Sequence, residues 1–152
     1  MRFKKISLIF VIVLSVFSLG MNPRAQSKVD QQLNDVISRS MSDQVIQDIE
    51  SAYAAEDADL LMTFIDKSFN GRANFQVVMQ EYFAYVDHPH LHFVIYMVTS
   101  YKDKLSIRAH WLKKARTASG VMINIQGTCT IDLKKKPNGL KIVKIEKDNP
   151  FF

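Results

Sequence analysis

The sequence predicts an α+β protein in which helices precede and cover an antiparallel sheet, and two patterns support this class. Apolar and polar side chains alternate almost strictly from Val121 to Leu133, which is typical of a strand with one buried face. Apolar residues recur at helical spacing from Phe75 to Val86. Helical patterns fill the first part of the chain and strand patterns the last, without a repeat or a linker to a second domain.

The first 20 residues have the layout of a secretory signal peptide. Basic side chains at positions 2, 4 and 5 precede the apolar run Ile6–Leu19, and Ser18 and Gly20 are small residues suited to cleavage after Gly20. The apolar run is short for a membrane span. We therefore expect export to the periplasm or the medium, with no stable membrane insertion after cleavage. The alternative is an uncleaved segment that anchors the protein to the membrane.

The charge distribution gives little support for nucleic-acid binding. The formal net charge of +5 includes three basic residues of the expected signal peptide. Residues 21–99 hold 5 basic and 11 acidic side chains, and residues 100–152 hold 12 and 4. This asymmetry is typical of solvated faces on an acidic helical layer and a basic sheet layer. The run Lys134–Lys136 is interpreted as a solubilising hairpin tip, so we predict no nucleic-acid partner; contact with an anionic partner is the alternative.

After the signal peptide, we expect residues 21–41 to form a tether and a short amphipathic helix, and residues 42–152 to form the domain. The tether is the polar segment Met21–Lys28, and the amphipathic helix would end near Ser38–Ser42, where each serine can cap a helix start. Three helices are then expected. The first follows the apolar face from Val45 to Tyr53, the second begins at the cap residue Asp57, and the third follows Gly71 with Asn74 as its cap.

Four strands are expected after the helices. Their predicted ranges are His92–Thr99, Lys104–Lys114, Val121–Leu133 and Leu140–Glu146. The sequence Pro137-Asn138-Gly139 is a strong signal for a hairpin between the last two strands. The segment Asp87–His90 is expected to end the third helix, because proline disfavours helical geometry in the residue before it. The lone Cys129 lies on the apolar face of its strand and is expected to be a core residue.

The order of these elements resembles the nuclear transport factor 2-like superfamily, which includes ketosteroid isomerase and SnoaL-type cyclases. The resemblance covers roughly Ser42 to Phe152. It is carried by the segments Ile49–Tyr53 and Glu56–Leu61, by Phe69 and Trp111, and by Gly139–Ile145. The resemblance implies a cone-shaped fold in which three N-terminal helices pack on a curved antiparallel sheet. It also implies a pocket at the wide end of the cone and a homodimer. Fold alone does not settle function.

Histidines near the start of the first strand are the candidate metal ligands. His88, His90 and His92 would share one face of an extended chain, and Asp87 could add a carboxylate. The alternative is an exposed turn, because the segment lacks the further spacing of a known metal motif. We therefore predict no resident cofactor.

A small-molecule isomerase or lyase is the alternative function, and it would need an acid or base in the cone pocket. The candidates near the expected mouth of the pocket are Asp66, Asp87 and His92. No catalytic motif of the superfamily matches this chain residue by residue, so no catalytic role is carried over.

A non-catalytic binding module is the function that we favour from the sequence. Aromatic side chains on the helices and the first strand could line a pocket for a small apolar ligand, although such residues are also ordinary core. The polar face of the third strand, from Asn124 to Thr130 with Arg108 and His110 beside it, could pair two subunits. The pocket candidates are Tyr53, Phe64, Phe69, Tyr82, Phe83 and Tyr96.

Overall fold

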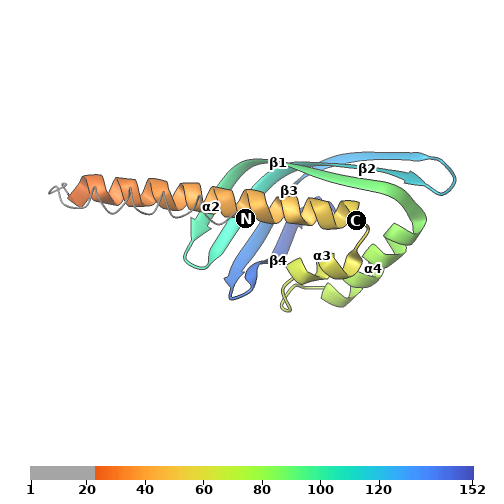
Figure 1. The fold of residues 1–152 in the computed structure, drawn as a ribbon, viewed down its shortest axis with the longest axis horizontal. Helices are drawn as coiled ribbons and strands as arrows, with labels where there is room; N and C mark the ends of the chain where they lie inside the picture. The colour runs from red at the N-terminus through yellow and green to blue at the C-terminus, as the bar shows by residue number, and fades with distance from the viewer. Residues whose placement is uncertain (1–22) are drawn as a thin grey trace, which may run out of the picture. The chain divides into compact units, whose positions relative to one another are not determined.

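The computed structural model describes residues 23–152, so the expected signal peptide at 1–20 lies outside the described residues. Three helices precede four strands, which confirms the α+β class (Figure 1). The elements are α2 (Pro23–Ala54), α3 (Ala58–Phe64), α4 (Arg72–Tyr85), β1 (Val86–Tyr101), β2 (Lys104–Thr117), β3 (Met122–Lys136) and β4 (Gly139–Lys147).

Residues 35–152 form one compact unit that contains the whole sheet. The part of α2 before Asp35 belongs to a second unit, and its side chains from residue 26 onward are exposed. Among the described helices, none has the length and apolar content needed to span a bilayer.

The strands form one antiparallel sheet in the order β1-β2-β3-β4, so each strand pairs with its neighbour in sequence. The predicted hairpin is confirmed: Lys136 pairs with Gly139, which leaves Pro137-Asn138 as a two-residue turn. Gly139 has a φ of 104°, a conformation that strongly favours glycine.

Helix α2 is continuous through the region where the sequence predicted a break. The hydroxyl of Ser42 donates to the carbonyl oxygen of Ser38 at 2.8 Å, and both residues are buried. Arg39 and Asp43, also four residues apart, form an ion pair at 3.1 Å on the exposed side. The serine hydroxyl therefore bonds back to the preceding turn instead of capping a new helix. In the described part of residues 21–41, the expected tether is helical from Pro23 onward.

Helices α3 and α4 form near the predicted positions. Asp57 caps α3 as expected, because its Oδ1 accepts from the backbone N–H of Leu60 at 2.8 Å. Helix α4 begins earlier than predicted: Gly71, with a φ of 77°, is its N-cap, and Asn74 lies inside the helix. A glycine supplies the left-handed geometry but no side-chain hydrogen bond.

Strand β1 starts at Val86, six residues before the predicted start. The pairing with β2 shifts between Asp87 and His90, and His88 adopts a positive φ of 51°. Such a bulge leaves Pro89 without a ladder partner, so its missing N–H is not needed. The segment expected to form a turn is therefore part of the strand.

The core lies between the helices and one face of the sheet. That face includes Leu105, Ile107, Ala109 and Trp111 of β2, as the alternation predicted. On β3 the prediction holds for the second half, where Cys129, Ile131 and Leu133 are buried. It is wrong for the first half, because Val121 and Ile125 are 61% and 47% exposed. Strand β4 pairs with β3 only from Cys129 onward, so the first half of β3 forms an open edge.

Candidate functional site

Four of the six aromatic pocket candidates belong to a connected set of rings in the core. The ring centroid of Tyr53 lies 5.3 Å from Phe83 and 6.0 Å from Tyr82. Phe69 is connected to these rings through Phe75 and Phe151. Phe64 also packs partly buried against the core.

Tyr96 does not join the other aromatic candidates. Its ring stacks on His110, with centroids 5.0 Å apart. His110 lies on the face of β2 opposite Trp111, so Tyr96 contacts the outer surface of the sheet. The sheet therefore separates Tyr96 from the aromatic cluster of the core.

Lys113 is a buried cation on the inner face of the sheet, and the sequence analysis did not identify it. Lys113 is 2% exposed. It lies on β2 and pairs in the ladder with Leu91 of β1 and with Ile125 of β3. None of the ion pairs and hydrogen bonds found within residues 23–152 involves this amine. Burial lowers its pKa, because desolvation disfavours the charged form.

Two tyrosine hydroxyls accompany this amine. The Nζ atom of Lys113 lies 5.1 Å from the centroid of the Tyr82 ring, which in turn lies 6.0 Å from the Tyr53 ring. The hydroxyl oxygens of Tyr53 and Tyr82 are buried and have no hydrogen-bond partner in the described structure. Burial, with a smaller effect of Tyr82, raises the pKa of Tyr53 far above its usual value, so its hydroxyl stays protonated. We call Lys113, Tyr53 and Tyr82 the Lys113 site.

The sheet beside Lys113 is closely packed around Trp111. Its indole N–H donates to the carbonyl of Asp148 at 3.2 Å, and a Cβ added at Gly127 would lie 2.6 Å from the indole ring. Glycine is therefore needed at position 127. Cys129 is buried as expected, and burial, followed by the charge of Asp148, raises its pKa to about 12. A thiol in that state is a poor nucleophile at neutral pH.

Asp66 lies on the loop after α3, away from the Lys113 site. Its Oδ1 accepts from the backbone N–H and the hydroxyl of Ser68 at 2.9 and 2.7 Å, and its Oδ2 lies 3.0 Å from the Lys136 amine. These contacts, those of Ser68 first, hold the pKa of Asp66 far below its usual range. The carboxylate therefore stays ionised, which gives it little strength as a base.

The histidine candidates lie along β1 with exposed side chains. In residues 23–152, no three His, Cys, Asp or Glu side chains are arranged to hold a metal ion. His92 instead lies 3.1 Å from Glu50, whose Oε1 also accepts from the backbone N–H of Phe93 at 2.6 Å. Glu50 thus ties α2 to β1. Asp87 is exposed at the bulge and pairs in the ladder with Arg116.

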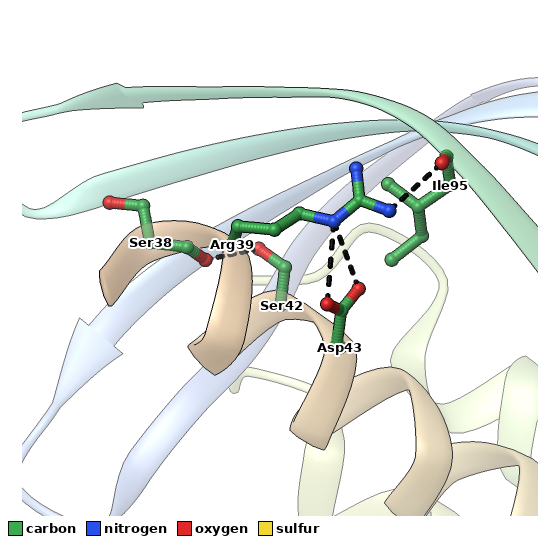
Figure 2. Close-up of polar contacts among 5 residues, drawn as sticks. All are labelled: Ser38, Arg39, Ser42, Asp43 and Ile95. Atoms are coloured by element: carbon green, nitrogen blue, oxygen red, sulfur yellow. Dashed lines mark hydrogen bonds and ion pairs between the residues drawn. The ribbon is translucent and has the colours of Figure 1, made fainter. Parts of the chain in front are cut away.

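Two grooves on the surface of residues 23–152 are lined by charged side chains. One, of about 630 Å³, follows α2 and is lined by residues that include Arg39 and Asp43. Arg39 bridges α2 and β1 there, because its Nη2 donates to the carbonyl of Ile95 at 3.0 Å (Figure 2). The other, of about 460 Å³, lies between the loop after α3 and the β3–β4 hairpin.

Comparison with known proteins yields structural neighbours, whereas no family model and no curated protein matches the sequence. A provisionally named aromatic ring hydroxylase from Novosphingobium aromaticivorans superposes with a TM-score of 0.66 at 17% identity, over 72% of this chain and 87% of that chain. A protein with a cystatin-like fold from the same organism, described as nuclear transport factor 2-like, gives 0.61 at 16% identity, over 79% and 86%.

A third neighbour is a provisionally named dehydratase of the nuclear transport factor 2-like family from Streptomyces avermitilis. It gives a TM-score of 0.60 at 10% identity and covers 73% of this chain and 95% of that chain. At such identities the likeness establishes the fold and not the activity. The chain folds as three helices on a curved four-stranded antiparallel sheet. Together with the structural neighbours, this arrangement shows that the chain has the cone fold of the nuclear transport factor 2-like superfamily.

Proposed function

We propose that this protein is an exported binding module that holds a small, mostly apolar molecule at the Lys113 site. The observation that carries the proposal is a pair of buried tyrosine hydroxyls, those of Tyr53 and Tyr82, that have no hydrogen-bond partner in residues 23–152. The buried residue Lys113 lies beside them, and its amine takes part in no hydrogen bond or ion pair found there. Buried donors without partners destabilise a fold, and a ligand that supplies acceptors would remove that cost.

The missing group is best matched by a carboxylate. Its negative charge would complement Lys113, and its two oxygens can accept hydrogen bonds from the amine and the hydroxyls together. The adjoining rings of Phe83 and Phe151 would contact an apolar, preferably aromatic, body. Because Tyr82 and Phe83 are only partly buried, this part of the site reaches the surface.

Calorimetric titration with a matched pair of probes tests the proposal. We expect the wild type to bind 2-naphthylacetate at least about tenfold more tightly than 2-(2-naphthyl)ethanol, because charged hydrogen bonds are worth more than neutral ones. Lys113→Met should abolish the preference. Lys114→Met is the matched control, because this neighbouring lysine is exposed. Failure of both probes to bind would contradict a ligand-binding role, and equal binding would contradict the carboxylate assignment alone.

The second candidate is a lyase or isomerase, and the lowered pKa of Lys113 favours it. A neutral amine in an apolar site can accept a proton from a carbon acid, as a general base does. Asp66, Asp87 and His92 lie elsewhere, so this mechanism would rest on Lys113 alone. Loss of turnover of an identified substrate in Lys113→Met, with binding retained, would establish the enzyme and exclude the purely binding role.

Two further parts of the proposal concern location and assembly. Export is inferred from the first 20 residues, whose basic start and apolar run have the layout of a signal peptide. A homodimer through the outer face of the sheet is supported by apolar side chains exposed there, including Val94 and Met97.

A further inference from the structure

A basic groove on the surface shares no lining residue with the Lys113 site. The groove has a volume of about 460 Å³ and is bordered by the loop after α3, the start of α4 and the β3–β4 hairpin. Its lining residues that matter here are Asp66, Lys67, Arg72, Lys136, Asn138 and Lys141.

Backbone contacts hold the two walls of this basic groove together. Ile65 forms an isolated parallel bridge with Ile142, and the N–H of Asp66 donates to the carbonyl of Ile142 at 2.9 Å. Lys141 adds a hydrogen bond from its amine to the carbonyl of Thr63, near the end of α3. The loop after α3 is therefore attached to the edge strand β4, and the groove is a built feature of the fold.

The lining carries more positive than negative charge. Four cationic side chains line the groove, and Asp66 is the one carboxylate among its lining residues. That carboxylate is already engaged by Ser68 and by Lys136. Among the ion pairs within residues 23–152, none includes Lys67, Arg72 or Lys141. The groove therefore has a formal excess of three positive charges, from four cations and one anion.

Arg72 is a donor without an acceptor at this position. Its Nε atom is buried and has no hydrogen-bond partner within the described structure. Arg72 is also the first residue of α4, which has no side-chain cap and no acidic residue in its first turn. The positive end of the helix dipole is thus uncompensated beside the guanidinium.

We propose that the basic groove binds a phosphate group. A phosphate presents several acceptor oxygens and up to two negative charges, which match a guanidinium, two or three amines and a helix N-terminus better than a single carboxylate does. A soluble phosphate ester and a phospholipid headgroup share this chemistry. The proposal is independent of the ligand at the Lys113 site.

Titration calorimetry with inorganic pyrophosphate, and sedimentation with vesicles of phosphatidylcholine with and without phosphatidylglycerol, test the groove. We expect Arg72→Gln to weaken binding at least about tenfold, because it removes a charged donor. Lys135→Met is the matched control: this lysine is exposed on the same hairpin and does not line the groove. Lys67→Met is a second test variant on an exposed position, in case Arg72→Gln fails to fold.

The pattern of results assigns the source of the phosphate or rejects the site. Binding of pyrophosphate that is weakened in Arg72→Gln or Lys67→Met, but not in Lys135→Met, supports a soluble ligand. Binding to phosphatidylglycerol vesicles alone, with the same dependence on the variants, supports a lipid headgroup. Equal weakening by Lys135→Met would show general charge attraction and overturn the proposal. Absence of binding to both probes would also overturn it.

Discussion

Lys113 couples the candidate ligand site to the stability of the protein. Its folded-state pKa lies below the ordinary lysine value of 10.5, because burial disfavours the ammonium form. Between these two pKa values the unfolded chain holds a proton that the folded chain lacks, so the free energy of unfolding rises with pH across that interval. The nearby Tyr53 hydroxyl stays protonated there, because its own pKa is raised.

We therefore predict that Lys113→Met stabilises the ligand-free protein at neutral pH by about 1 kcal/mol, because it removes a buried charge that has no ion pair and no hydrogen bond in residues 23–152. The gain should shrink as the pH rises from the lowered pKa of Lys113 toward 10.5, because the folded wild type gives up its buried charge over that interval. Urea unfolding at several pH values measures this difference. Lys114→Met should show no such pH-dependent gain. A Lys113→Met variant that is less stable at neutral pH would show that the amine has a favourable partner.

Single residues differ in how far the sequence reveals them. Asp57 is predictable because a cap acts within one turn of the helix. Lys113 follows from the alternation that buries Leu105 to Trp111, if that alternation is continued for two more residues. Glu50 is different: it accepts from the N–H of Phe93, 43 residues away, and no local pattern indicates that contact.

At the scale of elements, the junction between α2 and β1 depends on Arg39. Its guanidinium bonds the carbonyl of Ile95 at a register shift of β1, where the strand ladder is interrupted, and also pairs with Asp43 (Figure 2). A guanidinium that satisfies a backbone carbonyl at a bulge fixes the helix against the edge strand.

We predict that Arg39→Ala lowers the free energy of unfolding by about 1 kcal/mol, through loss of a charged hydrogen bond that is partly exposed. Asp43→Ala should cost less, because an exposed ion pair contributes little. Chemical denaturation of both single variants and of the double variant separates the two contacts. A cost of Asp43→Ala equal to that of Arg39→Ala would show that the ion pair within α2, and not the bond to Ile95, accounts for the contribution of Arg39.

The sequence did not predict the element boundaries that depend on tertiary packing. Ser38 and Ser42 are good helix caps in isolation, but both are buried here, the Ser42 hydroxyl bonds to the carbonyl of Ser38 in the preceding turn, and the helix continues. Pro89 normally ends a helix or turn, and here a bulge accommodates it within β1. The first half of β3, which contains Ile125, is exposed because neither β4 nor the core covers it.

At the scale of the whole molecule, the outer face of the sheet carries exposed apolar side chains that belong to neither proposed binding site. The register aligns Val94 with His110 and Thr128 across three strands, and Arg108 with Thr130 in the adjacent row. Val94, Tyr96 and Met97 expose roughly half of their side-chain surface on this side. Apolar groups beside a polar rim are typical of an interface between subunits.

We predict that the wild type is a homodimer and that Val94→Glu converts it to a monomer, because each copy would bury an unpaired carboxylate in the two-fold interface. Light scattering coupled to size-exclusion chromatography measures the mass. Val77→Glu is the matched control, since Val77 is exposed to a similar extent but lies on α4 and not on the sheet. If Val94→Glu remains a dimer, the subunits associate through another surface. If the wild type itself is a monomer, the homodimer is excluded.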